Sequence, residues 1–373
     1  MPALSRLAIG AAILLAMLCG FLDPVWPEAG LSFKRLHIFL FNLVCGGALV
    51  IYHTEGRRAF SGRGKAYVAL ALIYALSAAA GFYPLTLAIS VPLCLLVESV
   101  RVRRFSFLPV DFFWRDRPAG DKFLHASLLC LSLAVALASL VIANNEYLGL
   151  GHYRKLTLDV FFLGYSFPVS LLTFSLMFSF MKAEGPGRQP LLHQAAFWVV
   201  NAGVIVFFAF IVLEMVALEI AAALTLFAAV CAIYYLFLKG APALQQTTFL
   251  LSGMTFLLLT GLTGVFYLLH YPYPGLEPYL GPLLALHAML SLYGWNLSGL
   301  IIVIRRDDFP IRLSSAAALL VHWNLVLVLM PLGKLDPLLG LLAVAVCAVF
   351  LRLVLFSPGD PGPQRVAPAG SDG

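Results

Sequence analysis

Charged residues are scarce in this chain, and long apolar runs take their place. Asp, Glu, Lys and Arg make up 11% of the 373 residues, whereas 61% are hydrophobic. A water-soluble domain carries about 25% charged residues, because most of its surface must face water. The scarcity of charge therefore excludes a soluble globular protein and predicts an all-α integral membrane protein.

Cysteine pairs and the motifs of soluble enzymes are also missing. The six cysteines lie within apolar segments and show no paired spacing, so we expect neither disulfides nor a zinc site. The sequence has no phosphate-binding glycine loop and no zinc-protease helix. The net charge of +6 comes mostly from short loops, where basic residues set membrane orientation, so nucleic acid is not an expected partner. The lipid bilayer is the expected partner, and a redox partner or other membrane subunits stay open.

The apolar runs predict a bundle of about twelve transmembrane helices, because lipid cannot satisfy an open backbone. Together they form one polytopic domain over residues 1–356, and the Pro- and Gly-rich segment 357–373 is predicted to be a disordered cytoplasmic tail. The predicted spans are roughly 5–22, 36–53, 65–81, 83–100, 124–144, 157–181, 191–213, 215–238, 247–269, 279–304, 313–332 and 336–356.

Positive charge alternates between the connections and predicts the orientation. The loops after spans two and four, HTEGRRAFSGRGK and RVRRFSFLPVDFFWRDRPAGDK, are basic, and those after spans six, eight and ten repeat the bias. The positive-inside rule places these loops and both termini in the cytoplasm. We expect the protein in the cell inner membrane as a multi-pass protein.

Span ten carries polar side chains inside an apolar run that has no charge from Tyr279 to Ile304. At a rise of about 1.5 Å per residue this run can cross a layer of about 30 Å. Polar groups at such depth are costly unless they face a partner or a cofactor. Ordinary hydrogen bonds between helices are the alternative, as is an ion pair with Lys155 for Asp159. The candidates for a supporting shell or a polar pathway are His322, Tyr293, Trp295, Asn296, Asn42 and Asp159.

Two histidines share a local pattern on spans two and ten. LHIFLFNLVCGG and LHAMLSLYGWNLSG each place Leu-His before apolar residues, then an Asn and a Gly. Both spans run from outside to inside, so His37 and His287 are predicted in the outer half of the bilayer. A neutral imidazole is a good iron ligand, and two histidines at similar depth can hold one haem. The glycines that follow would admit either a flat macrocycle or a closely packed helix. The pair predicts a haem b site with His37 and His287 as its metal ligands.

Twelve spans, cytoplasmic termini and histidines on spans two and ten resemble subunit I of the haem-copper oxidases and nitric-oxide reductases. In that family one histidine on each of these two spans holds the low-spin haem, and His37 and His287 match those positions. LHAMLSLYGWNLSGL also resembles the family's His-rich segment of span ten. The chain is similar as well to the haem- and copper-containing membrane proteins of the nitric-oxide response. The resemblance implies one b-type haem that serves electron transfer or gas sensing.

The chain departs from that family at the copper site. Ala288 and Met289 follow His287 where the family has His-x-His, and span six has no histidine. We therefore expect no copper and no reduction of oxygen or nitric oxide, and we leave enzymatic activity open. Two other classes remain, a twelve-span secondary transporter and a non-catalytic membrane subunit. His53, His125 and His193 are expected to be ordinary interfacial histidines at span ends.

Overall fold

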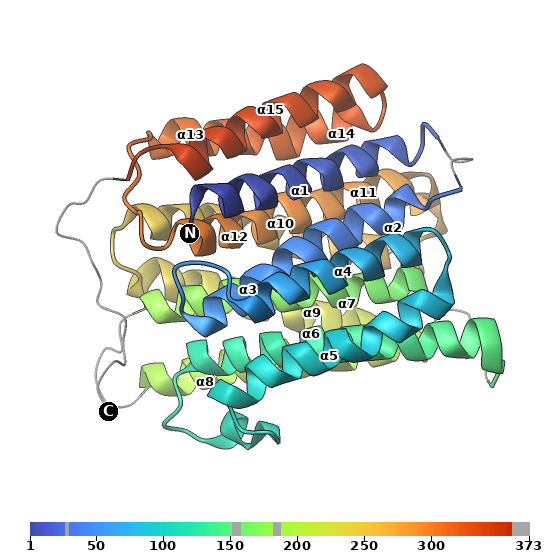
Figure 1. Ribbon diagram of the computed structural model, residues 1–373, viewed down its shortest axis with the longest axis horizontal. Coiled ribbons are helices and arrows are strands. Elements are labelled where there is room, and N and C mark those ends of the chain that lie inside the picture. Colours follow the sequence, from blue (N-terminus) through green and yellow to red (C-terminus); the bar gives the residue numbers. More distant parts are fainter. Residues whose placement is uncertain (27–29, 151–157, 182–187, 360–373) are drawn as a thin grey trace.

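The computed structural model describes residues 1–26, 30–150, 158–181 and 188–359, without the side chains of 158–163 and 188–190. Within these residues the chain is helical, and the helices lie lengthwise beside one another (Figure 1). An isolated bridge pairs Ile311 with Gly359. The all-α prediction is confirmed, and the arrangement fits a multi-pass membrane protein.

The helical elements alternate between regular α-helix and short segments of other helix types. Here η1, η3, η5 and η6 are π-helical, and η2 and η4 are 3-10 helices. In chain order they are α1 (Ala3–Leu22), α2 (Phe33–Ile38), η1 (Phe39–Gly46), α3 (Gly47–Glu55), α4 (Gly62–Ala79), α5 (Tyr83–Arg104), η2 (Pro109–Phe113), α6 (Ala119–Ala143), η3 (Asn144–Leu148), α7 (Leu158–Phe180), α8 (Arg188–Val212), α9 (Val216–Gly240), α10 (Gln245–Leu268), η4 (Pro274–Tyr279), α11 (Leu280–Met289), η5 (Leu290–Asn296), α12 (Leu297–Arg305), α13 (Ser315–Asn324), η6 (Leu325–Leu329), α14 (Met330–Gly333) and α15 (Pro337–Phe356).

Among the described residues, ten helical stretches are long and apolar enough to cross a membrane. Consecutive elements make up single stretches, such as α2, η1 and α3 over Phe33–Glu55, or η4 to α12 over Pro274–Arg305. The other two predicted spans correspond to α4 and to α7, in which Gly164–Phe180 is a shorter apolar helix. Helices therefore occupy all twelve predicted positions, and ten of them meet the length and hydropathy of a span.

The first described helix begins, and the last one ends, on the same side of the bundle. Arg6 Nη1 donates to the Leu355 carbonyl oxygen at 3.1 Å, and Arg305 Nη1 donates to the same oxygen at 2.7 Å. We call this side the basic end, because α3, α5 and α12 finish there beside Arg57, Arg104 and Arg305; it lies at the left of Figure 1. Both ends of the described chain thus share one side, as an even number of crossings requires.

The predicted tail is partly ordered where it leaves α15. Arg305 Nη2 donates to the Ser357 carbonyl at 2.7 Å, and the Arg312 amide donates to the Pro358 carbonyl at 2.8 Å. Residues 360–373, the rest of that predicted tail, lie outside the described residues.

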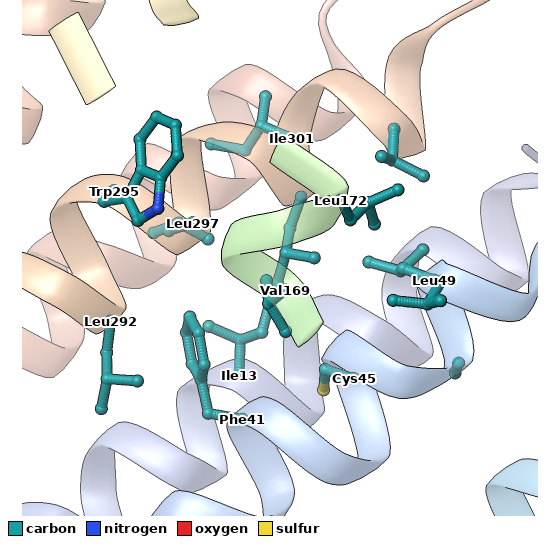
Figure 2. Packing of buried hydrophobic residues seen from close by; sticks show 14 of the residues in the cluster. Ile13, Phe41, Cys45, Leu49, Val169, Leu172, Leu292, Trp295, Leu297 and Ile301 are labelled. Carbon is teal, nitrogen blue, oxygen red and sulfur yellow. The ribbon is translucent and has the colours of Figure 1, made fainter. Parts of the chain in front are cut away.

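The two stretches that carry His37 and His287 form the centre of the bundle. In Phe33–Glu55 and in Pro274–Arg305, 83% of the apolar window is buried inside the protein, against 11% in α9. Both central stretches pack on α7. Figure 2 shows Val169 of α7 with Cys45 on one side and Leu297 on the other. His37 and His287 therefore lie on the two most enclosed stretches, whereas His322 lies on Ser315–Gly333, of which 33% is buried.

Candidate functional site

Each of the three membrane-embedded histidines stands just before a π-helical segment. The segment η1 begins two residues after His37, and η5 and η6 begin three residues after His287 and His322. A π turn inserts an extra residue into the helix, and such turns occur frequently at functional sites. The spacing of apolar residues is almost the same in both helix types, so the sequence did not predict these turns.

His37 is held against the first helix. Its Nδ1 lies 2.7 Å from the carbonyl oxygen of Ala16 and 3.3 Å from the hydroxyl of Tyr293. Gly20, one turn after Ala16, makes room for the ring, because a Cβ there would lie 2.8 Å from Nδ1. Since a carbonyl oxygen can only accept, Nδ1 carries the proton and Nε2 keeps its lone pair.

His287 is held against α10 in the same way. Its Nδ1 lies 3.0 Å from the carbonyl oxygen of Thr260 and 3.3 Å from the hydroxyl of Thr263. Gly264 again stands one turn after the carbonyl, and a Cβ there would lie 3.2 Å from the ring Cε1. The Nδ1–H therefore donates, and Nε2 of His287 is the free ring nitrogen as well.

The two imidazoles thus occupy matched seats, each made of a helix carbonyl, a hydroxyl and a glycine. Metal-binding histidines commonly donate the second ring N–H to a carbonyl oxygen, which fixes the ring and its tautomer. The seats belong to different neighbours, α1 for His37 and α10 for His287. In the described part of the chain, no hydrogen bond or ring contact joins His37 to His287, and no three His, Cys, Asp or Glu side chains group as a metal site.

Tyr293 connects two of the predicted site residues. Its hydroxyl meets His37, and its backbone carbonyl accepts a hydrogen bond from His322 Nε2 at 2.6 Å. The His322 ring stacks on Phe350 at 4.9 Å and meets the edge of Phe256 at 5.1 Å. His322 is buried, and its Nε2 donates to a backbone oxygen. This is a hydrogen bond that holds helices together.

Trp295 and Asn296 tie η5 to α7. Trp295 Nε1 donates to the Ser170 hydroxyl at 3.0 Å, and that hydroxyl donates to Asn296 Oδ1 at 2.9 Å. Asn42 differs, because its buried amide nitrogen and oxygen have no hydrogen-bond partner among the described residues. A buried amide without a partner is costly and calls for a ligand or a water molecule. The side chain of Asp159 lies outside the described residues.

The glycines after the two histidines pack against protein. Of the two alternatives for these glycines, the structure shows close helix packing. A Cβ on any of the four would collide with a side chain of a neighbouring helix: Val169 at Gly46, Tyr67 at Gly47, Phe256 at Gly294 and Thr173 at Gly299. Side chains of the neighbouring helices fill the space that these glycines leave.

A buried polar cluster around His125 was not predicted. Arg101 Nη1 lies 2.9 Å from His125 Nε2, and Arg101 Nε donates to Glu98 at 2.7 Å. Phe105 stacks on the His125 ring at 4.6 Å, so this histidine, near the start of α6 as expected, is buried in protein contacts. The sequence signal for this cluster was the number of charged residues in the loop after α5. Only the folded loop shows that charged side chains there turn inward.

The same cluster holds Asp111. Its carboxylate accepts from the Ser106 hydroxyl at 2.6 Å and lies 3.3 Å from the Arg117 guanidinium. Burial raises the pKa of Asp111, but the hydrogen bonds from Ser106 and the charge of Arg117 outweigh it, so this pKa lies below its usual value. The cluster therefore fixes the long loop on the helix ends.

Comparison of the chain with protein families, with curated proteins and with solved structures finds no match.

Proposed function

We propose that this protein binds one b-type haem through Nε2 of His37 and Nε2 of His287. The matched seats carry the proposal. Each fixes Nδ1–H on a backbone carbonyl and leaves the other ring nitrogen as a lone-pair donor, which is the donor chemistry that haem iron requires. When bound, haem supplies one-electron transfer or gas binding.

The exposure of the three histidines also supports this assignment. His37 and His287 each keep accessible surface although their stretches are the most enclosed in the bundle, whereas His322 is fully buried. A ligand can reach only a ring that has open space beside it. The unpartnered amide of Asn42, five residues after His37, is a further polar group that a bound molecule could satisfy.

Proton-coupled transport has weaker support from the same contacts. A proton wire from His37 to His322 would have to pass through Tyr293, which offers its hydroxyl to one and its backbone carbonyl to the other. A carbonyl oxygen accepts but does not donate a proton. The contacts therefore favour a cofactor site over a continuous proton pathway.

Absorption spectra of the purified protein test the assignment. We expect a Soret band that shifts on reduction with dithionite, and we expect both His37→Ala and His287→Ala to lose it while the protein still inserts. His270→Ala is the matched control, because His270 bonds only within its own turn, to the Tyr267 carbonyl. A protein without a Soret band after expression with ample haem would disprove the proposal. A spectrum lost in only one of the two variants would leave one histidine as the iron ligand.

Carbon monoxide separates the two uses of the haem. If the reduced spectrum shifts with the gas, a coordination position is open and gas sensing is favoured. If it does not shift, both positions are filled by the protein and electron transfer is favoured.

We further infer that the basic end faces the cytoplasm of a cell with an inner membrane. The support is the charge of its loops, since Arg57, Arg58, Arg103, Arg104 and Arg115 all lie there. A fluorescent protein fused to the C-terminus should fluoresce, because it folds in the cytoplasm. A periplasmic phosphatase active at the same position would reverse the orientation.

A further inference from the structure

A cleft of about 310 Å³ opens at the basic end, where α3 and α5 finish and α4 begins. Four guanidinium groups line it, from Arg57, Arg63, Arg103 and Arg104, against the single carboxylate of Glu55. Four positive charges and one negative charge leave the lining with a net charge of +3. None of these residues belongs to the histidine site.

The start of α4 adds to this positive charge. The helix begins with Gly-Arg-Gly-Lys after the N-cap residue Ser61, and its first turn has no acidic residue. A helix N-terminus already carries a partial positive charge, so acidic residues are the stabilising choice in the first turn. Arg63 and Lys65 are the reverse of that choice. Glu55 supplies one negative charge beside Arg63, and a bound anion would supply another.

Arg63 also has a hydrogen-bond donor without an acceptor. Its Nε lies 3.5 Å from Glu55, but its Nη1 is shielded from solvent and has no partner among the described residues. Each N–H of a guanidinium requires an acceptor when water cannot reach it. On the opposite wall Arg104 is already positioned, because it donates to the Thr54 carbonyl at 3.2 Å and pairs with Asp121 at 3.3 Å.

We propose that this cleft binds a phosphate group, either of a phospholipid headgroup or of a free phosphate. The planar guanidinium forms paired, charge-assisted hydrogen bonds with phosphate oxygens. A phosphate would give Arg63 Nη1 its acceptor and would offset the net charge of the lining. Basic pockets between transmembrane helices on the cytoplasmic side are suited to anionic headgroups. Exposed Val102 and Phe107 lie close by in the chain and could meet acyl chains.

The test uses the full chain in a zwitterionic detergent, titrated with phosphatidylglycerol, with phosphatidylcholine or with inorganic phosphate. We expect phosphatidylglycerol, with its anionic headgroup, to raise the apparent melting temperature more than phosphatidylcholine, in which the choline offsets the charge of the phosphate. Stabilisation by inorganic phosphate alone would identify a free phosphate as the ligand. No stabilisation by either phosphate source would overturn the proposal.

Two variants locate the effect. We expect Arg63→Gln with Arg103→Gln to weaken the apparent affinity at least tenfold. Arg352→Gln is the control, because this exposed arginine lies near the same end on α15, outside the cleft. An equal loss in the control would show a general effect of charge and would refute the site. If the double variant does not fold, Arg63→Lys replaces it, since Lys keeps the charge but not the paired geometry; an undiminished affinity in that variant would refute the site too.

Discussion

The central stretches Phe33–Glu55 and Pro274–Arg305 contrast with the peripheral stretches Leu191–Val212 and α9. Burial inside the protein reaches 83% in both central windows, but only 22% and 11% in the peripheral ones. Mean hydropathy runs the opposite way, at 1.7 and 1.4 in the centre and 2.4 in both peripheral stretches. In this comparison the two less hydrophobic stretches are the more deeply buried, although Ala119–Leu148 combines a hydropathy of 2.5 with 56% burial.

The reason lies in the solvent. Lipid is as apolar as a leucine side chain, so apolar surface gains little by leaving it, and helices associate through close packing and hydrogen bonds. Glycine, serine, asparagine and histidine serve those contacts and lower the hydropathy of a stretch. In Phe33–Glu55 and Pro274–Arg305 a low hydropathy coincides with deep burial and with the candidate site.

The largest expected effect comes from filling a glycine in the centre. A Cβ at Gly299 would lie 2.7 Å from Thr173 Cγ2, so Gly299→Val must push α12 away from α7. We expect a loss of more than about 3 kcal/mol, the upper range for overpacking, seen as a loss of monodisperse protein after detergent extraction. Gly281→Val is the control, because nothing lies within 4 Å of a Cβ there. Equal yields would show that the central helices are loosely packed.

Truncating leucines compares the two regions directly. Leu300 in α12 is 0% exposed, whereas Leu224 in α9 is 49% exposed. We expect Leu300→Ala to lower the free energy of unfolding by about 2–5 kcal/mol through its cavity, and Leu224→Ala to change it little, because lipid fills the gap. Unfolding in sodium dodecyl sulfate measures both. Similar losses would mean that α9 is covered by a further protein rather than by lipid.

The loss of stability on replacing a glycine beside His37 or His287 should be larger where a Cβ would lie closer to the ring. Gly20→Ala places a Cβ 2.8 Å from His37 Nδ1, and Gly264→Ala places one 3.2 Å from His287 Cε1. We expect losses of about 1 kcal/mol for Gly20→Ala and less for Gly264→Ala. Gly10→Ala meets a side chain only at 3.4 Å, so it should be neutral. Melting temperatures in that order support tight seats, and a neutral Gly20→Ala would contradict them.

The smallest expected effect is that of a single hydroxyl. Tyr293→Phe removes the contact with His37 Nδ1 at 3.3 Å and keeps the ring packed on Phe41. Hydrogen bonds between membrane helices are worth about 0.6 kcal/mol, so the melting temperature should fall only slightly. Tyr279→Phe, at an exposed tyrosine, is the control. A loss several times larger would mean that this hydroxyl holds more than His37.

The sequence predicts the helices of this fold far better than their pairing. Apolar runs and their length locate the helices, because crossing lipid demands both. Polar groups at depth drew attention to the stretches that carry His37 and His287, which the structure places at the centre of the bundle. The sequence did not predict which groups surround each histidine. These surroundings depend on Gly20 in α1 and on Gly264 in α10, and only the packing of the helices brings these glycines beside the rings. The burial of His125 was not predicted for a similar reason, because burial at a span end depends on how the adjacent loop folds.

The carbonyl of Leu355 joins parts of the chain that are synthesised at very different times. It accepts from Arg6 near the beginning and from Arg305 at the end of α12. Without α15, Arg6 and Arg305 would still share one acceptor, because both also pair with Asp308, which follows α12. The Leu355 carbonyl is thus a second acceptor common to both arginines, and removal of α15 would take away this acceptor together with the helix on which α1 packs.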